Sequence, residues 1–287
     1  MMLIIGAVVV IVCVLGAYAA HGGHLGVLWQ PLEFVIIIGS AIGAFIIGNP
    51  KTILSQVGGA LGLAFKGSMY SKKDYLDLLC MQYVVFKLIK TKGMLVLESH
   101  IENPHESAVF SRFPSFVNNH HASVFFCDYL RMLTMGSENV HQMEDLMNEE
   151  IEIHHHGRAQ LASALQTMGD SFPALGIVAA VLGVIHTMGS ISQPPEVLGH
   201  LIGAALVGTF AGILISYGFV APIAGLVGQL YNNEEKYFQC MKAGIIACMN
   251  GYAPAIAVEF ARKSIEPEFR PDFYELETAI EAAASAS

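Results

Sequence analysis

The sequence predicts an all-α polytopic membrane protein with four transmembrane helices and a helical cytoplasmic domain. The chain of 287 residues is 54% hydrophobic and only 14% charged, whereas soluble domains carry about 25% charged residues. Four stretches are apolar over the roughly 20 residues that a transmembrane helix needs. All 15 Lys and Arg residues lie outside these stretches, in residues 51–170 and 232–287. Composition, span length and charge placement therefore agree on one fold class.

The four expected spans are residues 1–20, 32–48, 171–191 and 201–227. The first resembles a signal peptide, because Ala17–Ala19 has the small residues of a cleavage site. No Lys or Arg precedes its apolar run, however, so we interpret it as a span. Loops that carry Lys and Arg stay in the cytoplasm. Both termini and the long middle segment are therefore expected to be cytoplasmic, with two short turns outside.

The cytoplasmic segments, residues 49–170 and 228–287, are expected to be mostly helical. Ser71 begins a stretch in which apolar residues repeat at helical spacing, and Gly93 ends it. From Asn139 to Asp170 there is no proline, so one long helix is expected to continue into the third span. Pro267, Pro271 and the final run of Ala and Ser indicate a weakly ordered tail.

Small residues recur at helical spacing on three spans, in pairs that allow helix backbones to approach closely in lipid. The pairs are Gly39 with Gly43, Gly176 with Gly183, and Gly208 with Gly212. They indicate either packing within one subunit or a surface that takes a partner helix or lines a pore.

The spans hold few polar groups. No Asp, Glu, Lys or Arg lies in the middle of any of them, and Glu33 lies at the outer edge of the second. Proteins that move ions alone usually hold an ionisable side chain at mid-depth. If ions cross here, we expect a partner to supply the carboxylate. Thr209 and Tyr217 place hydroxyls on the fourth span, where they either bond to nearby carbonyls or belong to an ion path.

Several classes of function are not expected. The net charge of −9 does not suit a nucleic-acid binder. The five cysteines show no C-x-x-C spacing, and the consecutive His154, His155 and His156 lack the i, i+4 spacing of chelating pairs. No phosphate-binding loop or nucleophile elbow is found. We therefore expect no metal, no cofactor and no enzymatic activity.

Three long stretches resemble the A subunit family of the bacterial flagellar stator, MotA. They are "GGHLGVLWQPLEFVIIIGSAIGAFIIGN" (Gly22–Asn49), "GDSFPALGIVAAVLGVIHTMG" (Gly169–Gly189) and "GYAPAIAVEFARK" (Gly251–Lys263). The resemblance implies a homo-oligomeric ring, a pentamer, in the bacterial inner membrane. It also implies a MotB-type B subunit dimer inside the ring, whose Asp carries the ion, and torque on the rotor switch protein FliG.

The resemblance also assigns roles to single residues. Pro173 and Pro222 match two family prolines of the ion path. Pro173 either occupies the first turn of a helix, where proline is tolerated, or kinks a longer helix and acts as a hinge, which we favour. Glu98 matches a family glutamate of the rotor interface, and Lys90 stands where an arginine is usual. Glu150 is a weaker candidate for that interface.

The transported ion is expected to be a proton. Sodium-type relatives tend to carry a threonine on the third span where this chain has Ala180, and alanine offers no oxygen to a dehydrating cation. Thr209 does not discriminate, because proton-type and sodium-type members share it.

Three alternatives stay open. The ExbB and TolQ energisers also surround a partner helix dimer, but they have three spans. A stand-alone channel or transporter would conduct ions without a partner. A passive membrane scaffold would conduct none.

Overall fold

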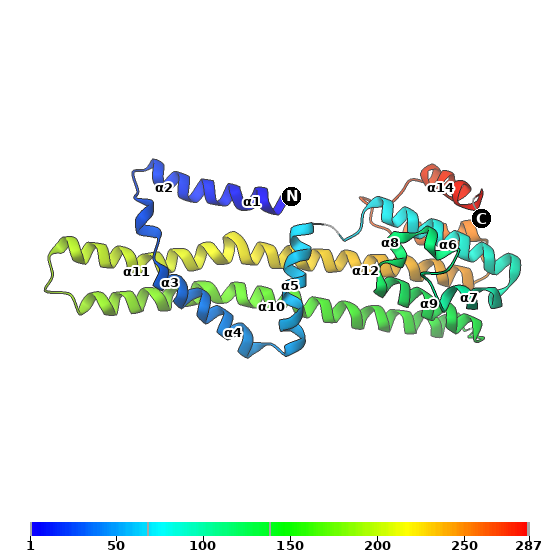
Figure 1. The fold of residues 1–287 in the computed structure, drawn as a ribbon, viewed down its shortest axis with the longest axis horizontal. Coiled ribbons are helices and arrows are strands. Elements are labelled where there is room, and N and C mark those ends of the chain that lie inside the picture. The colour runs from blue at the N-terminus through cyan, green and yellow to red at the C-terminus, as the bar shows by residue number, and fades with distance from the viewer. Residues whose placement is uncertain (1, 68, 138, 286–287) are drawn as a thin grey trace. The chain divides into compact units, whose positions relative to one another are not determined.

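The computed structural model describes residues 2–67, 69–137 and 139–285, and within these ranges the regular structure is helical and no strand occurs (Figure 1). The all-α prediction is therefore confirmed. The chain divides into two compact units. The first holds the described residues up to Gly67 together with His156–Tyr231, and the second holds Met69–His155 together with Asn232 onward. Two helices, α10 (Val140–Met188) and α12 (Ala221–Met249), contribute to both units.

Four helical stretches are long and apolar enough to cross a membrane: Met2–Ala20, Leu25–Gly48, Val140–Met188 and Pro195–Met249. The predicted limits of the four spans within these stretches stay predictions. Large apolar side chains such as Val8, Ile47 and Leu206 are exposed on them, as expected of a surface that faces lipid.

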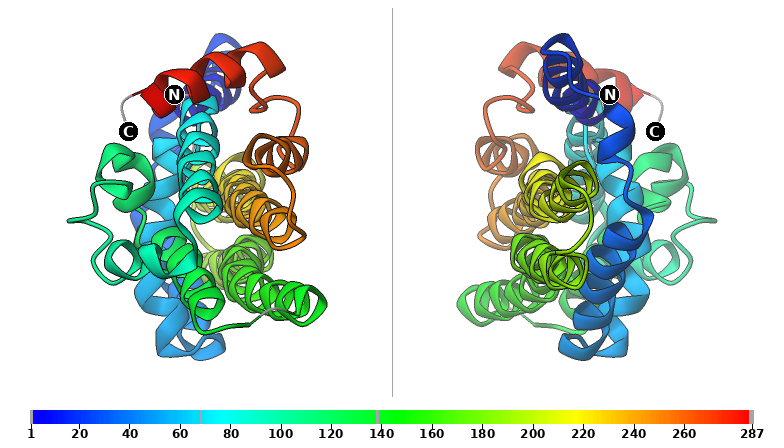
Figure 2. Two further views of the ribbon diagram at one scale, coloured as in Figure 1. Left: turned by 90° about the vertical axis from the view of Figure 1, so that its right-hand side faces the viewer. Right: turned by 90° about the vertical axis from the view of Figure 1, so that its left-hand side faces the viewer.

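The first unit is built from short helices around a long pair. Its elements are α1 (Met2–Ile11), α2 (Ala17–Ala20), α3 (Pro31–Phe34), α4 (Ser40–Gly48), α5 (Lys51–Lys66), α11 (Pro195–Ile215), and its shares of α10 and α12. Figures 1 and 2 show α11 beside the last part of α10, with α3 next to both. A small core of Ile37, Ala41, Phe172, Ala179 and Ala211 joins the apolar stretch Leu25–Gly48 to α10 and α11.

Three π-helical turns interrupt the apolar helices of this unit: η1 (Val12–Gly16), η3 (Val35–Gly39) and η6 (Ser216–Val220). Each lies between two α-helical segments of the same span. Such turns widen a helix locally and are frequent at functional sites.

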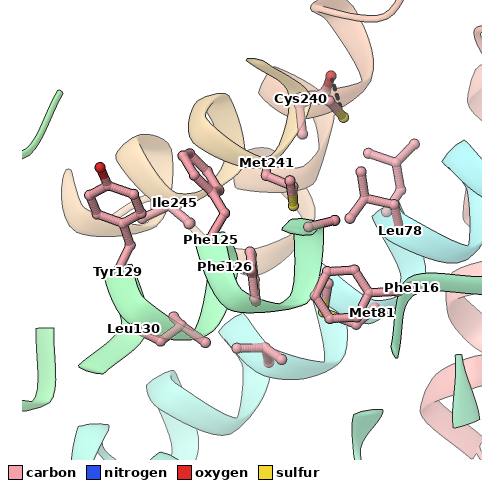
Figure 3. Packing of buried hydrophobic residues seen from close by; sticks show 14 of the residues in the cluster. Leu78, Met81, Phe116, Phe125, Phe126, Tyr129, Leu130, Cys240, Met241 and Ile245 are labelled. Carbon is pink, nitrogen blue, oxygen red and sulfur yellow. Dashed lines mark hydrogen bonds between the residues drawn. The ribbon is translucent and has the colours of Figure 1, made fainter. Parts of the chain in front are cut away.

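The second unit has a large apolar core. Its elements are α6 (Lys72–Lys92), α7 (Glu98–Ile101), α8 (Pro114–Val117), α9 (His120–Thr134), α13 (Pro254–Lys263), α14 (Phe273–Ser285), and its shares of α10 and α12. Figure 3 shows Leu78 and Met81 of α6, Phe126 of α9 and Met241 of α12 packed together, all fully or almost fully buried.

Local signals explain where α6 begins and ends. The Ser71 backbone N–H donates to the Asp74 carboxylate at 2.8 Å, and the Asp74 N–H donates back to Ser71 Oγ. This reciprocal cap satisfies two of the N–H groups that a helix start leaves unpaired. Gly93 follows the last turn with φ of 85°, a conformation that favours glycine. The start and stop predicted for this helix are confirmed.

A buried polar contact joins α6 to α12. Gln82 is fully buried, and its Nε2 donates to the Cys240 carbonyl at 3.4 Å. Gly244 faces the same side chain, because a Cβ at Gly244 would stand 1.8 Å from Gln82 Oε1. Any larger residue at position 244 would therefore force the Gln82 amide out of its present place.

The C-terminal segment differs from its prediction. Helix α14 forms where a weakly ordered tail was expected, and residues 286–287 lie outside the described residues. Leu276 is buried in the core of the second unit, and the Glu275 N–H donates to Asp272 Oδ1 at 2.8 Å. A helix cap and one apolar anchor outweigh the composition of the segment.

Candidate functional site: the glycine seam between α10 and α11

Four of the predicted small residues meet along one line, which we call the glycine seam: Gly176, Gly183, Gly208 and Gly212. A Cβ on Gly212 would stand 2.5 Å from the Phe172 carbonyl oxygen, and one on Gly176 would stand 2.8 Å from the Gly208 carbonyl oxygen. These distances are too short for any side chain. The two helices therefore contact each other backbone to backbone, as small residues allow.

The seam continues toward the turn that joins the helices. A Cβ on Gly183 would stand 2.7 Å from Ala205 Cβ, and one on Gly208 would stand 3.0 Å from Ala179 Cβ. By contrast, a Cβ on Gly39 or Gly43 would meet nothing within 4 Å among the described residues. Gly39 and Gly43 therefore make no close contact with the described part of this chain. Of the two interpretations of this pair, a surface for another helix is the one that remains.

Pro173 lies deep inside α10, which begins at Val140. It is therefore not in the first turn of its helix. Proline has no N–H, so the Gly169 carbonyl lacks the donor that would normally stand four residues later. A Cβ on Gly169 would stand 3.3 Å from Val220 Cγ1 and 3.5 Å from the Ala221 nitrogen. The weakened turn of α10 thus lies against the π-helical turn η6.

Ala180 and Thr209 flank the glycine seam and are both half-buried. The Ala180 nitrogen lies 3.2 Å from where a Cβ on Gly208 would stand, and Thr209 Cα lies 3.4 Å from where one on Gly176 would stand. The structure thus brings together two of the residues predicted for the ion path.

Tyr217 and Pro222 lie elsewhere in the first unit. They line a separate cavity of about 260 Å³ with Phe219 and with Leu3 and Gly6 of α1. Tyr217 is exposed, as is Pro222. Among the described residues, Tyr217 and Pro222 therefore belong to this cavity beside α1 and not to the glycine seam.

Sequence reasoning missed the position of Glu33. This residue lies in the first turn of α3, yet its carboxyl group reaches the seam. Its Oε2 lies 3.2 Å from where a Cβ on Gly208 would stand, and its Oε1 lies 3.6 Å from where one on Gly183 would stand. The sequence did carry one signal, because Glu33 is the only Asp, Glu, Lys or Arg residue in the apolar stretch Leu25–Gly48.

The predicted rotor-interface residues lie in the second unit. Lys90 near the end of α6 and Glu98 at the start of α7 are exposed, and neither side chain forms a hydrogen bond or ion pair with a described residue. Glu150 differs, because it accepts a hydrogen bond from the Tyr129 hydroxyl at 2.7 Å. Burial, and then this bond, raise the pKa of Tyr129. Lys90 and Glu98 are the better placed to bind another protein.

The histidine run was not expected to bind metal, and its geometry gives it another role. His155 Nδ1 lies 3.2 Å from Glu235 Oε2, in a contact between α10 and α12. Within the described ranges, no group of three or more His, Cys, Asp or Glu side chains is arranged to hold a metal ion.

Comparison with known proteins covers both units. Residues 4–93 match the motility protein A N-terminal family, and residues 118–240 match the MotA/TolQ/ExbB proton channel family. The chain is 44% identical over 98% of its length to motility protein A of Salmonella typhimurium, of which it covers 96%.

Two solved structures are also similar. The fold matches C. jejuni MotAB with a TM-score of 0.77 at 19% identity, over 93% of this chain and 96% of that chain. It matches the flagellar MotAB stator complex from Bacillus subtilis with a TM-score of 0.71 at 25% identity, over 89% and 92% of the two chains.

Proposed function

This chain belongs to the motility protein A family, and from that membership we propose that it is the A subunit of a bacterial flagellar stator. The family and the four apolar helices make it a multi-pass inner-membrane protein. With a MotB-type partner it forms a proton channel that couples ion flow to torque. The observation that carries the proposal is the 44% identity that extends through 98% of the chain, because it includes both units.

The partner's role follows from what the spans lack. The glycine seam closes α10 against α11 so tightly that neither helix can carry an ion-binding side chain of its own at Gly176 or Gly212. A B subunit dimer, threaded through a pentameric ring of A subunits, supplies the Asp that carries the proton. The similar solved structures are complexes of both subunits, which supports a partner of this kind.

The ion is a proton, with sodium the less favoured alternative. Ala180 and the glycines beside it offer no side-chain oxygen of their own to a dehydrated cation, while Thr209 supplies one hydroxyl and Glu33 one carboxyl group. A proton needs no cage of oxygen ligands, whereas a metal cation does.

Pro173 couples ion flow to movement. One charge that crosses the membrane releases only about 2.3 kcal/mol per 100 mV, so the states of the moving helix must lie close in energy. A helix with a missing hydrogen bond at Pro173 bends at a lower energy than an intact one. Both termini and the second unit lie in the cytoplasm, where Lys90 and Glu98 bind the rotor switch protein FliG.

A complementation experiment tests the proposal. The chain would be produced, with its MotB-type partner, in a flagellated strain that lacks both stator subunits. We expect rotation to be restored, to be lost when the partner's Asp is replaced by Asn, and to follow external pH. Rotation that follows external sodium at fixed pH would instead show sodium coupling, and no restoration with normal membrane insertion would contradict the stator assignment.

One observation and two experiments separate the alternatives. ExbB and TolQ have three spans, whereas four helical stretches here are long and apolar enough to cross a membrane, which favours the stator reading. Liposomes that contain this chain alone should not conduct protons. Selective and saturable proton flux in such liposomes would support a stand-alone channel, and a passive scaffold would leave rotation independent of the partner's Asp.

A further inference from the structure

Glu33 presents an unpaired carboxyl group to the glycine seam. Its Oε2 is inaccessible to solvent and has no hydrogen-bond partner, and the side chain forms no hydrogen bond or ion pair with a described residue. Gly208 and Gly183 provide the space, because a Cβ on either would stand within 3.6 Å of a carboxyl oxygen. The glycine seam therefore holds the Glu33 carboxyl group in addition to the two closely packed backbones.

The predicted span limits place the carboxyl group below the membrane surface. Gly208 follows Leu201, the outer end of the predicted fourth span, by seven residues, which is about 10 Å at the rise of an α-helix. The hydrocarbon core is about 30 Å thick. On these predicted limits, Glu33 places an ionisable group about one third of the way in from the outer face.

An ion-pair role does not explain this residue. Elsewhere in the chain, Glu259 accepts two hydrogen bonds from Arg262 and Glu150 accepts one from Tyr129, so each of these carboxylates is stabilised where it stands. Glu33 has no such partner, and an unpaired charge is strongly disfavoured in an apolar environment.

Other titratable groups lie on the elements that pack against Glu33. They are His186 on α10, Glu196 and His200 on α11, and His24 just before the turn η2 (Leu25–Leu28). None is bonded to Glu33 among the described residues. Among the described residues, no fixed counter-charge is therefore bonded to the carboxyl group.

We propose that Glu33 is a second proton-binding site of the stator, which takes up protons from the outer side and delivers them toward the partner's carboxylate. The inference rests on the proposed function. The carboxylate binds a proton, becomes neutral beside Gly208, and releases the proton inward, regaining its charge. Thr209, one of the residues predicted for the ion path, follows Gly208 in the chain. Intramembrane carboxyl groups commonly serve such relays.

Chemical labelling tests the protonated state directly. Membranes that contain the assembled complex would be treated with dicyclohexylcarbodiimide, a lipid-soluble reagent that requires a protonated carboxyl group. The acid adds across one C=N bond, its proton goes to nitrogen and its oxygen bonds to carbon, and rearrangement gives a stable N-acylurea. Peptide mapping should find the adduct on Glu33, decreasing as external pH rises, and not on the exposed Glu196. An unmodified Glu33 at every pH would overturn the proposal.

Rotation measured against external pH tests the relay. Glu33→Gln keeps the size of the side chain but cannot exchange a proton, so the alkaline limb of the speed profile should move to lower pH by about one unit. Glu33→Asp keeps a carboxyl group and should move the speed profile part of the way back to that of the wild type. The exposed control Glu196→Gln should have the same profile as the wild type. Partner levels in the membrane are measured in parallel.

The outcomes separate this inference from the proposed function. If Glu33→Gln follows the wild-type profile at normal membrane levels, the relay is wrong although the stator assignment stands. If Glu33→Gln does not accumulate, the labelling of the wild-type complex decides, because a Glu33 that stays unmodified at every pH overturns the relay. If the wild-type chain rotates with the partner's Asp replaced by Asn, the proposed function itself fails, whereas the labelling result on Glu33 remains interpretable.

Discussion

The Phe172 carbonyl oxygen lies 2.5 Å from where a Cβ on Gly212 would stand, so α10 and α11 approach each other as closely as backbones permit. Phe172 directly precedes Pro173, the residue that interrupts the hydrogen bonding of α10. A backbone-to-backbone contact of α10 with α11 and the turn of α10 that lacks a hydrogen bond are therefore adjacent in the chain.

Gly212→Ala is expected to disrupt this contact. The new methyl group would strike a backbone atom, which cannot rotate away, and such overpacking costs about 1–3 kcal/mol. Membrane levels of the chain and copurification with the partner should both fall. The matched control is Gly203→Ala on the same helix, where a Cβ meets nothing within 4 Å. Equal damage from both substitutions would show that helix propensity, and not the seam, matters.

Pro173→Ala is expected to lower torque more than assembly. Alanine restores the missing N–H and stabilises a straight helix by up to about 3 kcal/mol, so bending at this turn becomes harder. Stall torque of tethered cells should fall while the membrane level of the complex stays normal. Pro195→Ala is the control, because Pro195 occupies the first turn of α11, where proline is replaceable. Normal torque in Pro173→Ala would contradict the hinge.

Charge changes at Lys90 and Glu98 are expected to weaken rotor binding in a cumulative way. A single exposed ion pair contributes only about 0.2–1 kcal/mol, so neutralising one residue should slow swimming slightly and neutralising both should slow it clearly. Glu98→Lys should be rescued by a charge reversal on the rotor protein. Glu106→Lys, at a nearby exposed position, should need no rescue. Unchanged swimming with both charges removed would eliminate this surface.

The second unit is expected to lose stability on mild acidification through His100. Burial, and then the charge of Lys92, lower the pKa of His100, whose Nδ1 lies 2.9 Å from the Ser107 hydroxyl oxygen. The unfolded chain then binds the proton more readily, with a pKa of about 6.5. The contribution is fully present above that value and is lost as pH falls through the lower folded pKa.

The measurement is thermal unfolding of the purified complex over this pH range. His100→Asn keeps a polar atom near the position of Nδ1 and removes the titration, so its melting temperature should depend less on pH than that of the wild type. His141→Asn, at an exposed position, should leave the dependence unchanged. Identical pH profiles for wild type and His100→Asn would contradict the assignment.

Local sequence signals predicted much of the fold. Ser71 and Gly93 bound α6 as expected, because caps and positive φ depend on a few neighbouring residues. The uninterrupted stretch after Asn139 became one helix that includes Pro173. The C-terminal helix was missed, because its order depends on Leu276 packing against distant residues.

The site was predictable only in part. Spacing identified the glycines of the seam, but the same spacing at Gly39 and Gly43 gave no contact within the chain, since periodicity does not say which face meets a neighbour. Glu33 seemed peripheral because its sequence position lies at the edge of a span. Its depth relative to Gly208 depends on how α3 lies against α11, and no pattern within either segment encodes that offset.

The contact between Gln82 and Gly244 has an evolutionary consequence. The two positions are far apart in the chain, yet no side chain fits at 244 while the amide of residue 82 occupies that space. Substitutions at the two positions should therefore covary in descendants of this lineage, with any branched residue at 244 accompanied by a shorter one at 82. A chain that carries only one of the two substitutions would be a less fit intermediate.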